Sequence, residues 1–560
     1  MNILAVIPAR GGSKGIKRKN LRLLNGKPLI YYQIKNALTS KWINDIVVTS
    51  DDDEILEYAS NFEVYLRKRP HELAQDNVTL DPVVYDATIY MENLLNKEYD
   101  IVITLQPTSP LLKPTTLDNA IERFLSENLD TLIPVINATH LYWKEENGQI
   151  VPDYKERLNR QWLPKKYKET GAFLITRREF VTKDSRFGRN IGIFILDEIE
   201  GLDIDTPIDW LIAETFLRRL KILFVVNGNE KIGMGHIYRT LTLADRFIGH
   251  EVLFLTYESN EQAIKVMHDA GYQVIVISED NLIKRIAEMH PDIVINDILD
   301  TDLGYIKKLK ELGVFVINFE DLGEGADEAH LVFNALYEKT NPNPNHRFGY
   351  EYECLNEKFY LYSPIEFRDP PKTLFISFGG VDQNNLTCKV LQLVPEIFSE
   401  TSIEKVITVI GPGYSHKAEL TTLLNELDSE KKCIEVHQNV KNMARLMRRA
   451  DIAITSNGRT IYELTAMGIP TISIAQNDRE TLHLFARYHR GIKYLGIACT
   501  VDQEDILNTI KEIANDSYLR KRMYLAQIEA SKVIRQGINR VINEILSEYW
   551  RWKNERDQTW

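Results

Sequence analysis

The chain has 560 residues, of which 44% are hydrophobic and 26% are charged, and its formal net charge is -12 at pH 7. Because this length exceeds what a single hydrophobic core supports, we expect two or more domains. The negative net charge argues against a general binder of nucleic acid or of acidic membranes, since both need a broad cationic surface.

Short β-branched runs alternate with stretches of helical length in the first part of the chain. The runs read NILAVIPA, DIVVTS, DIVITLQP and TLIPVI. This alternation predicts a parallel sheet covered by helices. The pattern restarts at RLKILFVVNGN and breaks again at FRDPPKTLFISFGG. We therefore predict an α/β domain over residues 1–219 and a two-lobed pair of doubly wound, Rossmann-like folds, with lobes over 220–368 and 369–560.

A cationic, glycine-rich turn, IPARGGSKGIKRKN, follows the first predicted strand. Its glycines let the backbone approach an anion closely, and Arg10, Lys14 and Lys19 offer charge to several phosphates at once. This combination predicts a polyphosphate site, with a mobile basic loop as the alternative. The spacing matches neither the phosphate loop that ends in Gly-Lys-Ser/Thr nor the dinucleotide motif.

Two later segments of the first domain carry polar residues suited to the same site. LQPTSPL places Gln106 just beyond a buried strand, where open α/β sheets bind ligands. GLDIDTPID separates Asp203 from Asp205 by one residue, so on an extended segment both carboxylates face the same side. Such a pair can hold one Mg²⁺, and a solvated acidic turn is the alternative.

Residues 1 to about 215 resemble the cytidylyltransferases that activate sialic acid and its nine-carbon relatives as CMP-sugars. The motifs that carry the resemblance are IPARGGSKGIKRKN, RPHELAQDNVT, LQPTSPL and DIDTPID. The resemblance implies transfer of CMP from CTP to a nonulosonic acid with release of pyrophosphate, Mg²⁺ as cofactor, and a homodimer formed through this domain. Charge neutralisation by Arg10, Lys19 and the Asp205-bound metal is expected to dominate the chemistry.

The same resemblance assigns the binding residues of the first domain. Phosphate and ribose contacts fall on Arg10, Ser13, Lys14, Lys19 and Asn20, cytosine contacts on Arg69 and Thr79, sugar contacts on Gln106, Lys144 and Arg160, and metal contacts on Asp203 and Asp205. Where sialic acid enzymes commonly carry Arg-Pro-Asn-Gly, this chain has Lys168, Glu169, Thr170 and Gly171. That departure favours a modified deoxy nonulosonic acid over N-acetylneuraminate.

A second glycine-rich turn opens the two-lobed unit, in VVNGNEKIGMGHIYRTLTLA. Gly233 and Gly235 permit a tight turn into a helix that begins near His236. Since a helix N-terminus disfavours a cationic imidazole, we expect a neutral His236 that can accept a proton. The alternative is a capping or core histidine.

The second lobe carries two more glycine turns. DIAITSNGRTIYELTAMGIPTISI predicts a strand, a turn at Asn457 and Gly458, and a helix in which Glu463 accepts the hydroxyls of a ribose while the helix start faces a diphosphate. LFISFGGVDQNN adds Gly379 and Gly380 at the end of the lobe's first strand.

Residues 220 to about 535 resemble the inverting UDP-sugar hydrolases of pseudaminic acid synthesis, which are two-lobed relatives of the B-type glycosyltransferases. GMGHIYR, NFEDL, SFGGVDQNNL and SNGRTIYEL carry the resemblance, and NDILD departs from it by placing Leu299 where an aromatic residue is common. The resemblance implies that His236 activates water at the anomeric carbon of a UDP-2,4-diacetamido-2,4,6-trideoxyhexose, which releases UDP and the free sugar. The resemblance further implies that the nucleotide is bound by Gly235, Gly379, Gly380, Asn457, Gly458 and Glu463.

Two alternatives remain for the second unit, a UDP-sugar-dependent glycosyltransferase and a UDP-sugar-binding module without catalysis. The four cysteines form no closely spaced pair, which argues against a zinc site or a disulfide framework. The chain also shows no secretory leader and no run of about twenty apolar residues. We therefore expect a cytoplasmic enzyme of small-molecule substrates that binds neither nucleic acid nor membrane.

Overall fold

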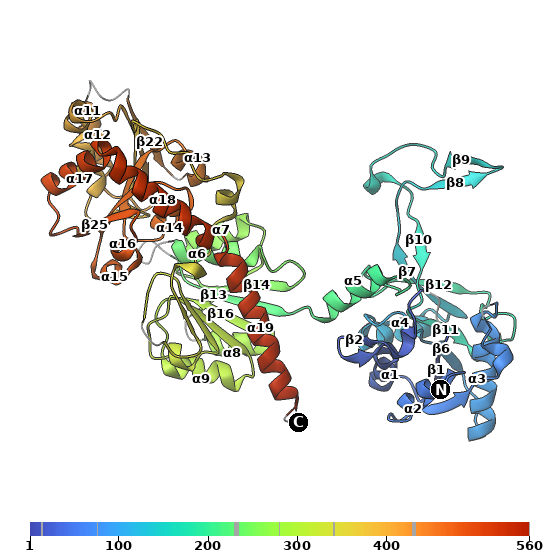
Figure 1. The fold of residues 1–560 in the computed structure, drawn as a ribbon. Helices are drawn as coiled ribbons and strands as arrows, with labels where there is room; N and C mark the ends of the chain where they lie inside the picture. Colours follow the sequence, from blue (N-terminus) through green and yellow to red (C-terminus); the bar gives the residue numbers. More distant parts are fainter. Residues whose placement is uncertain are drawn as a thin grey trace. The chain divides into compact units, whose positions relative to one another are not determined.

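The computed structural model describes residues 1–12, 15–75, 77–228, 234–278, 281–339, 342–427, 433–438 and 440–558. These residues form two compact units, Met1–Arg219 and Leu220–Trp560 (Figure 1). The division falls where the sequence restarts its strand pattern. Both units are built from β-sheets covered by helices, so the predicted α/β class is confirmed.

The first unit contains an eight-stranded sheet in the order β10-β7-β11-β6-β1-β4-β5, with β12 paired to β7. Its strands are β1 (Ile3–Pro8), β4 (Asp45–Ser50), β5 (Tyr65–Lys68), β6 (Ile101–Thr104), β7 (Thr131–Asn137), β10 (Tyr167–Glu169), β11 (Leu174–Arg177) and β12 (Ile191–Ile195). The four predicted strands, β1, β4, β6 and β7, run parallel to one another, but the sheet is mixed, because β10 and β11 run antiparallel to their neighbours. After β7 the chain returns without a crossover helix, and only an antiparallel return can do so.

Alternate residues of β1 divide the core of this unit between two faces. Ile3, Ala5 and Ile7 pack against the helices of one face, and Leu4 and Val6 pack against the other. The first face is covered by α1 (Leu29–Thr39), α2 (Asp53–Ala59) and α4 (Pro114–Ser126), and the second by α3 (Leu80–Leu95). Because helices cover both faces of the sheet, a ligand can bind only at the ends of the strands. The strand order reverses between β1 and β6, which is where such sheets bind ligands.

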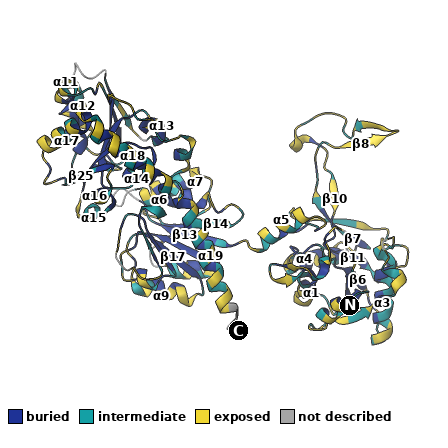
Figure 2. Cartoon of the chain, in the orientation of Figure 1, coloured by how far each residue is buried: buried dark blue, intermediate teal, exposed yellow. Residues whose placement is uncertain are grey.

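The remaining elements of the first unit are short, apart from α5. They are β2 (Leu23–Leu24), β3 (Lys27–Pro28), β8 (Trp143–Glu146), β9 (Gln149–Pro152), α5 (Pro207–Leu217) and the single turns Lys19–Leu21, His71–Leu73, Arg160–Trp162 and Arg178–Phe180. The β8–β9 hairpin belongs to an arm, residues 138–166, that stands away from the sheet (Figure 1). The arm is largely exposed (Figure 2), and the exposed fractions of Trp143 and Trp162 are 58% and 70%.

The second unit begins with a seven-stranded parallel sheet in the order β15-β14-β13-β16-β17-β18-β19. The strands are β13 (Lys221–Val226), β14 (Glu251–Tyr257), β15 (Val274–Ile277), β16 (Ile293–Asp297), β17 (Phe315–Phe319), β18 (Leu331–Asn334) and β19 (His346–Phe348). One face packs against α6 (Gly235–Ala244) and α7 (Glu261–Asp269), and the other against α8 (Leu282–Met289) and α9 (Leu303–Glu311).

A six-stranded parallel sheet follows, in the order β22-β21-β20-β23-β24-β25. Its strands are β20 (Thr373–Ser377), β21 (Lys405–Ile410), β22 (Ile434–Gln438), β23 (Ile452–Ser456), β24 (Thr471–Ala475) and β25 (Ile492–Ile497). Its helices are α10 (Leu386–Leu391), α11 (Val394–Glu400), α12 (Lys417–Glu426), α13 (Met443–Met447), α14 (Thr460–Ala466), α15 (Asp478–Thr481), α16 (Phe485–Tyr488), α17 (Gln503–Asn515) and α18 (Ser517–Ile534). The turns Ala326–Glu328, Tyr350–Tyr352 and Glu357–Leu361 precede this sheet. The predicted pair of doubly wound folds is confirmed.

The C-terminal helix α19 (Gly537–Gln558) differs from the prediction that residues 369–560 form one lobe. Ile538, Val541, Ile545 and Tyr549 lie in the core of the first sheet of this unit. These residues form an apolar stripe at helical spacing, which needs a partner, and the second sheet is already covered by its own helices. In the part of the chain that the structure describes, no helix combines the length and the apolar character needed to span a membrane.

Candidate active sites

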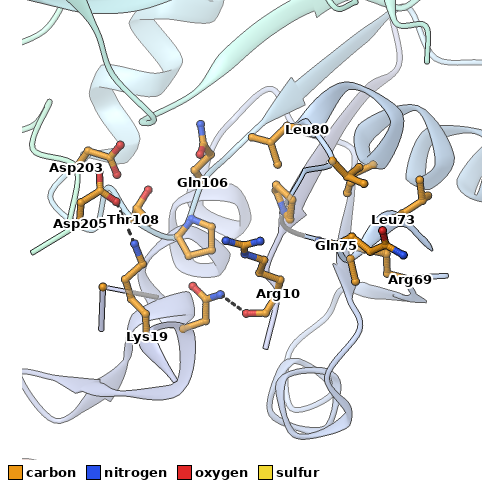
Figure 3. Close-up of a pocket in the computed structure, with 17 residues that line it drawn as sticks. Arg10, Lys19, Arg69, Leu73, Gln75, Leu80, Gln106, Thr108, Asp203 and Asp205 are labelled. Carbon is orange, nitrogen blue, oxygen red and sulfur yellow. Dashed lines mark hydrogen bonds and ion pairs between the residues drawn. The ribbon is translucent and has the colours of Figure 1, made fainter. Parts of the chain in front are cut away.

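A cavity of about 410 Å³ opens in the first unit at the carboxyl ends of β1 and β6. Four separated segments line it: the turn after β1, residues 69–83, residues 106–108 and the extended stretch before α5. The structure brings together seven of the residues predicted for this domain, namely Arg10, Lys19, Asn20, Arg69, Gln106, Asp203 and Asp205 (Figure 3). Strand-order reversal explains the location, because neighbouring loops diverge there and leave a crevice.

One end of the cavity lies away from the two aspartates (Figure 3). Figure 3 places Arg69, Leu73 and Gln75 at this end. Val78, Leu80 and Val83 add an apolar wall on which a planar base can rest, although the sequence analysis did not single them out. Arg69 is buried, and its Nη2 donates to the carbonyl oxygen of Thr49 at 2.8 Å. Thr79, which precedes α3, is not one of the lining residues.

The opposite end of the cavity carries the aspartate pair. Asp203 Oδ1 is buried and has no hydrogen-bond partner among the described residues. Burial raises the pKa of Asp203, the neighbouring Thr108 hydroxyl acts against the rise, and the negative charge of Asp205 adds to it. Asp205 Oδ1 lies 3.3 Å from Lys19 Nζ, which also donates to the carbonyl oxygen of Ile204 at 2.6 Å.

These donors fit a hard divalent cation. A buried, unpartnered carboxylate oxygen beside a second carboxylate offers the oxygen ligands that Mg²⁺ prefers. Within the described ranges, no three acidic, histidine or cysteine side chains gather at one point to hold a metal. Two carboxylates suffice, because Mg²⁺ usually keeps several waters and takes its other ligands from substrate phosphates.

Two glycines bring the backbone close to the aspartate pair. A Cβ on Gly15 would lie 2.4 Å from the carbonyl oxygen of Asp205, so only glycine allows this approach. A Cβ on Gly171 would lie 3.2 Å from both Asp203 Oδ2 and Gln106 Nε2. The segment that departs from the sialic acid enzymes therefore borders the aspartate end of the cavity.

Besides Thr79, two predicted residues, Lys144 and Arg160, are not brought into this cavity, and two more cannot be placed. Ser13 and Lys14 lie outside the described residues. Lys144 and Arg160 lie on the exposed arm, where Lys144 Nζ is 3.5 Å from Glu146 Oε2 and Arg160 Nε donates to the carbonyl oxygen of Thr139 at 3.1 Å. The arm carries both side chains away from the sheet that forms the cavity.

In the second unit, His236 is the second residue of α6, and its Nδ1 lies 2.5 Å from Asp297 Oδ1. Asp297 is the last residue of β16 and is fully buried. Burial acts to raise the pKa of Asp297, but the charges of Arg239 and His236 hold it below its usual value. Because an ionised carboxylate can only accept, Nδ1 carries the proton and Nε2 is left to act as a base.

The His236–Asp297 pair joins residues that are far apart in the sequence. The strand order of this sheet reverses between β13 and β16, so the helix after β13 begins beside the end of β16. Asp297 was not among the residues predicted for this site, although its position at the end of a strand was a usable signal. Leu299 and Glu320, just past the ends of β16 and β17, have φ angles of 70° and 53°. Such backbone strain is commonest at functional sites.

The glycine turns of the second sheet meet at its own point of strand-order reversal, between β20 and β23. Gly379 and Gly380 follow β20, and Asn457 and Gly458 follow β23. The φ angle of Gly379 is 81°, which favours glycine there. Burial raises the pKa of Glu463, in α14, to about 7.

The N-terminus of α10, which also lies at the carboxyl ends of these strands, already binds a carboxylate of the protein. Asp382 accepts from the backbone N–H groups of Leu386 and Thr387 at 2.9 Å each, so it caps α10. Among the described residues, the residue that precedes α14 makes no side-chain capping bond, and Glu480 Oε2 accepts from the Asn457 N–H of the same turn at 3.2 Å. The diphosphate position expected from the sequence is therefore compatible with α14 and not with α10.

Two family models match the chain. Residues 4–232 match the cytidylyltransferase family, and residues 373–538 match the C-terminal domain of glycosyltransferase family 28. CMP-N,N'-diacetyllegionaminic acid synthase of Campylobacter jejuni is 35% identical over 229 residues, which cover 40% of this chain and 97% of that protein. Pseudaminic acid cytidylyltransferase of the same species is 35% identical over 237 residues, which cover 40% of this chain and 98% of that protein.

Further similarities concern an uncharacterized protein and two solved structures. The uncharacterized protein, from Methanocaldococcus jannaschii, is 33% identical over 278 residues, and the match spans 46% of this chain and 56% of that protein. CMP:2-keto-3-deoxy-manno-octonic acid synthetase complexed with CTP has a TM-score of 0.30 and 18% identity, and covers 39% of this chain and 98% of that one. MurG of Acinetobacter baumannii has a TM-score of 0.43 and 13% identity, and covers 58% of this chain and 99% of that one.

The predicted fusion is thereby confirmed at the level of families. The family model and the two Campylobacter jejuni enzymes, nearly the whole length of which is matched, agree on the first unit. This chain belongs to the cytidylyltransferase family and carries, fused to that domain, a C-terminal domain of the glycosyltransferase family 28 type.

Proposed function

We propose that the first unit transfers CMP from CTP to a nonulosonic acid and releases pyrophosphate. The observation that carries the proposal is the single cavity that joins cations, an apolar wall and an aspartate pair. Arg10 and Lys19 neutralise the triphosphate, while Val78, Leu80 and Val83 receive the base. The anomeric hydroxyl of the sugar acid attacks the α-phosphorus and pyrophosphate leaves, so catalysis depends on positioning and charge neutralisation.

Asp203 and Asp205 would hold the proposed cofactor, Mg²⁺. When bound, the cation withdraws electron density from the phosphate oxygens and stabilises the charge that develops in the transition state. Lys19 positions Asp205 through its contact at 3.3 Å. Gly15 allows the phosphate-binding turn to lie against the backbone of Asp205.

The proposed sugar is a modified deoxy nonulosonic acid. Gly171 lies against Asp203 and Gln106, so the segment Lys168–Gly171 borders the side of the cavity where the sugar would bind. Its sequence differs from that of the sialic acid enzymes. Relatives named for legionaminic and for pseudaminic acid are both 35% identical to this chain, which supports this class of acid without separating its members.

A homodimer is part of the proposal. Lys144 and Arg160 lie on an arm that exposes Trp143, Ile150 and Trp162, which is unusual for a free surface. A second copy that received this arm would bury these side chains and could gain the two cations at its sugar site. Light scattering on the full chain tests this assembly.

Pyrophosphate release by the full chain tests the activity of the first unit. The assay contains CTP, MgCl₂ and one of legionaminic acid, pseudaminic acid or N-acetylneuraminate. We expect release with at least one of the first two and slower release with N-acetylneuraminate. No release with any of the three would contradict the proposal.

For the second unit we propose hydrolysis of a UDP-2,4-diacetamido-2,4,6-trideoxyhexose to UDP and free sugar. The His236–Asp297 pair supports this, because the carboxylate orients the imidazole and stabilises the imidazolium that forms when Nε2 takes a proton from water. The glycosyltransferase family 28 match keeps sugar transfer as a second candidate. Free sugar formed with water as the only acceptor would support hydrolysis, whereas turnover only after addition of an acceptor would support transfer.

A further inference from the structure

A chain of buried charges connects His236 to the second sheet of the same unit. We call it the buried charge chain, and its members are His236, Asp297, Arg239, Glu320, Arg459 and Glu353. Arg239 Nε donates to Asp297 Oδ2 at 2.6 Å, and Arg239 Nη1 donates to Glu320 Oε1 at 3.2 Å. The side chains of Arg239, Asp297, Glu320 and Glu353 are all at least nine-tenths buried. Each member is therefore sensitive to the charge of the next.

Arg459 is the member of the buried charge chain that belongs to the second lobe, where it directly precedes α14. It directly follows Gly458 at the end of the turn after β23. Its Nη1 donates to both carboxylate oxygens of Glu353 at 2.8 and 2.9 Å, and its Nη2 donates to Glu320 Oε1 at 2.8 Å. That same Glu320 oxygen accepts from Arg239. One oxygen thus joins the two arginines, so a displacement of Arg459 must change how Arg239 is held.

With Asp297, Glu320 and Glu353 all ionised, the charges in the buried charge chain balance when His236 is protonated. The buried charge chain contains three carboxylates and two guanidinium groups. The carboxylates belong to Asp297, Glu320 and Glu353, and the guanidinium groups to Arg239 and Arg459. With a neutral imidazole one negative charge is in excess, and proton uptake by His236 removes that excess. A buried site with this composition favours the imidazolium that general-base catalysis produces.

The pKa values of two of the three acidic members are raised, whereas Arg239 and His236 hold that of Asp297 below its usual value. Burial raises the pKa of Glu320 to about 7 and that of Glu353 to about 8. Glu463 also faces Glu353 and raises its pKa, while Cys354 and Tyr462, whose pKa values burial raises well above normal, stay neutral. No cation other than Arg239 and Arg459 is paired with Glu320 or Glu353 among the described residues.

We propose that Arg459 is a positioning residue for the base His236, and that it acts through Glu320, Arg239 and Asp297. The proposal rests on the hydrolase function proposed above and deepens it. Since Arg459 adjoins the glycine turn of the nucleotide site, the same few residues that receive the nucleotide also hold the far end of the buried charge chain. The buried charge chain then connects the residues that bind the nucleotide to the residue that acts as the base.

The kinetic test replaces Arg459 in the full chain and measures hydrolysis of the UDP-sugar. Arg459→Gln should lower kcat on the order of tenfold, while KM and the Kd of UDP change less than about threefold. Loss of a cation also leaves more negative charge around His236, so its proton is harder to remove and the acid limb of the kcat/KM profile moves to higher pH. Arg459→Lys keeps the charge and should restore the pH profile, with incomplete recovery of kcat because lysine cannot bind both carboxylates as a fork.

Arg479→Gln is the matched control. Arg479 also reaches from the second sheet to the first, where it binds the Asp300 carboxylate at 3.1 Å and the Tyr337 hydroxyl at 3.0 Å. Its contact with the buried charge chain is to the Glu320 backbone oxygen alone, at 3.5 Å. A general loosening of the two sheets would affect both arginine variants equally. Our proposal requires the pH profile to move in Arg459→Gln and to stay in place in Arg479→Gln.

A spectroscopic measurement makes the test independent of catalysis. A strongly hydrogen-bonded imidazole N–H gives a low-field proton resonance, and His236→Asn identifies the one from Nδ1. We expect this resonance to shift in Arg459→Gln and to remain in Arg479→Gln. If wild-type protein hydrolyses no UDP-sugar but the resonance behaves as expected, the hydrolase proposal fails and the positioning role stands. If resonance and pH profile are both unchanged in Arg459→Gln, the positioning role is refuted.

Discussion

Replacing Asp203 by asparagine should remove activity and at the same time stabilise the metal-free protein. The buried Oδ1 atom has no partner among the described residues, and burial and Asp205 raise the pKa of Asp203. A raised pKa means that folding disfavours the charged form, so above this pKa the carboxylate costs stability in the absence of a cation. Asparagine keeps the shape and removes that cost, but it also removes an anionic metal ligand.

The expected magnitudes follow from the role of the cation. Loss of a ligand that stabilises the transition state should slow cytidylyl transfer by more than about 100-fold, or roughly 3 kcal/mol. Mg²⁺ at about 100 times its Kd should stabilise the wild-type protein by about 2.7 kcal/mol, and the variant far less. Because Asp203 must be ionised to bind the cation, wild-type activity should also fall with decreasing pH sooner than for a carboxylate of ordinary pKa.

Pyrophosphate release and thermal unfolding with and without MgCl₂ measure both effects. Asp209→Asn is a suitable control, because Asp209 lies in the same segment but caps α5, where it accepts from the Thr206 backbone N–H at 2.7 Å and hydroxyl at 2.8 Å. The asparagine oxygen can still accept these hydrogen bonds and the one from the Asp205 backbone N–H at 3.1 Å, so the change should cost less than about 1 kcal/mol of stability and leave the Mg²⁺ response intact. The reasoning is refuted if Asp203→Asn turns over at near wild-type rates, or if Mg²⁺ raises its Tm as much as that of the wild type.

Three further predictions follow from the same sites. Gly15→Ala should strongly reduce cytidylyl transfer, because the new Cβ would lie 2.4 Å from the Asp205 carbonyl oxygen. Gly12→Ala, whose Cβ would meet none of the described residues within 4 Å, should be tolerated, and equal rates of pyrophosphate release in the two variants would contradict this. His236→Asn should abolish UDP-sugar hydrolysis, as product assays can show, and change the affinity for UDP by no more than a few fold. Glu463→Ala should mainly weaken UDP binding, which calorimetry measures, and neither variant should change CTP turnover. A fragment of residues 1–219 should fold and release pyrophosphate, because those residues form one compact unit, and an insoluble or inactive fragment would count against two independent cores.

The sequence predicts much of the first site because its residues lie in short local patterns. A strand followed by glycines and cations, a glutamine past a strand end, and two aspartates separated by one residue each identify themselves within a few positions. The structure places Arg10, Lys19, Gln106, Asp203 and Asp205 in one cavity. The apolar wall of Val78, Leu80 and Val83 has no comparable sequence pattern, because valine and leucine residues that line a ligand site cannot be distinguished in the sequence from those of the hydrophobic core.

The sequence by itself determined the α/β class, the restart of the pattern near residue 220 and the glycine turns, because alternation, helical spacing and tight turns are local properties of the chain. Only the tertiary structure decided which distant residues meet. The partnership of His236 with Asp297, 61 positions away, depends on the pairing of β13 with β16, and that of Arg459 with Glu320 depends on contact between two sheets. The antiparallel course of β11 and the packing of α19 on the first sheet of its unit are of the same kind. Strand order and sheet contact arise from packing of the whole chain, and no short pattern of residues encodes them.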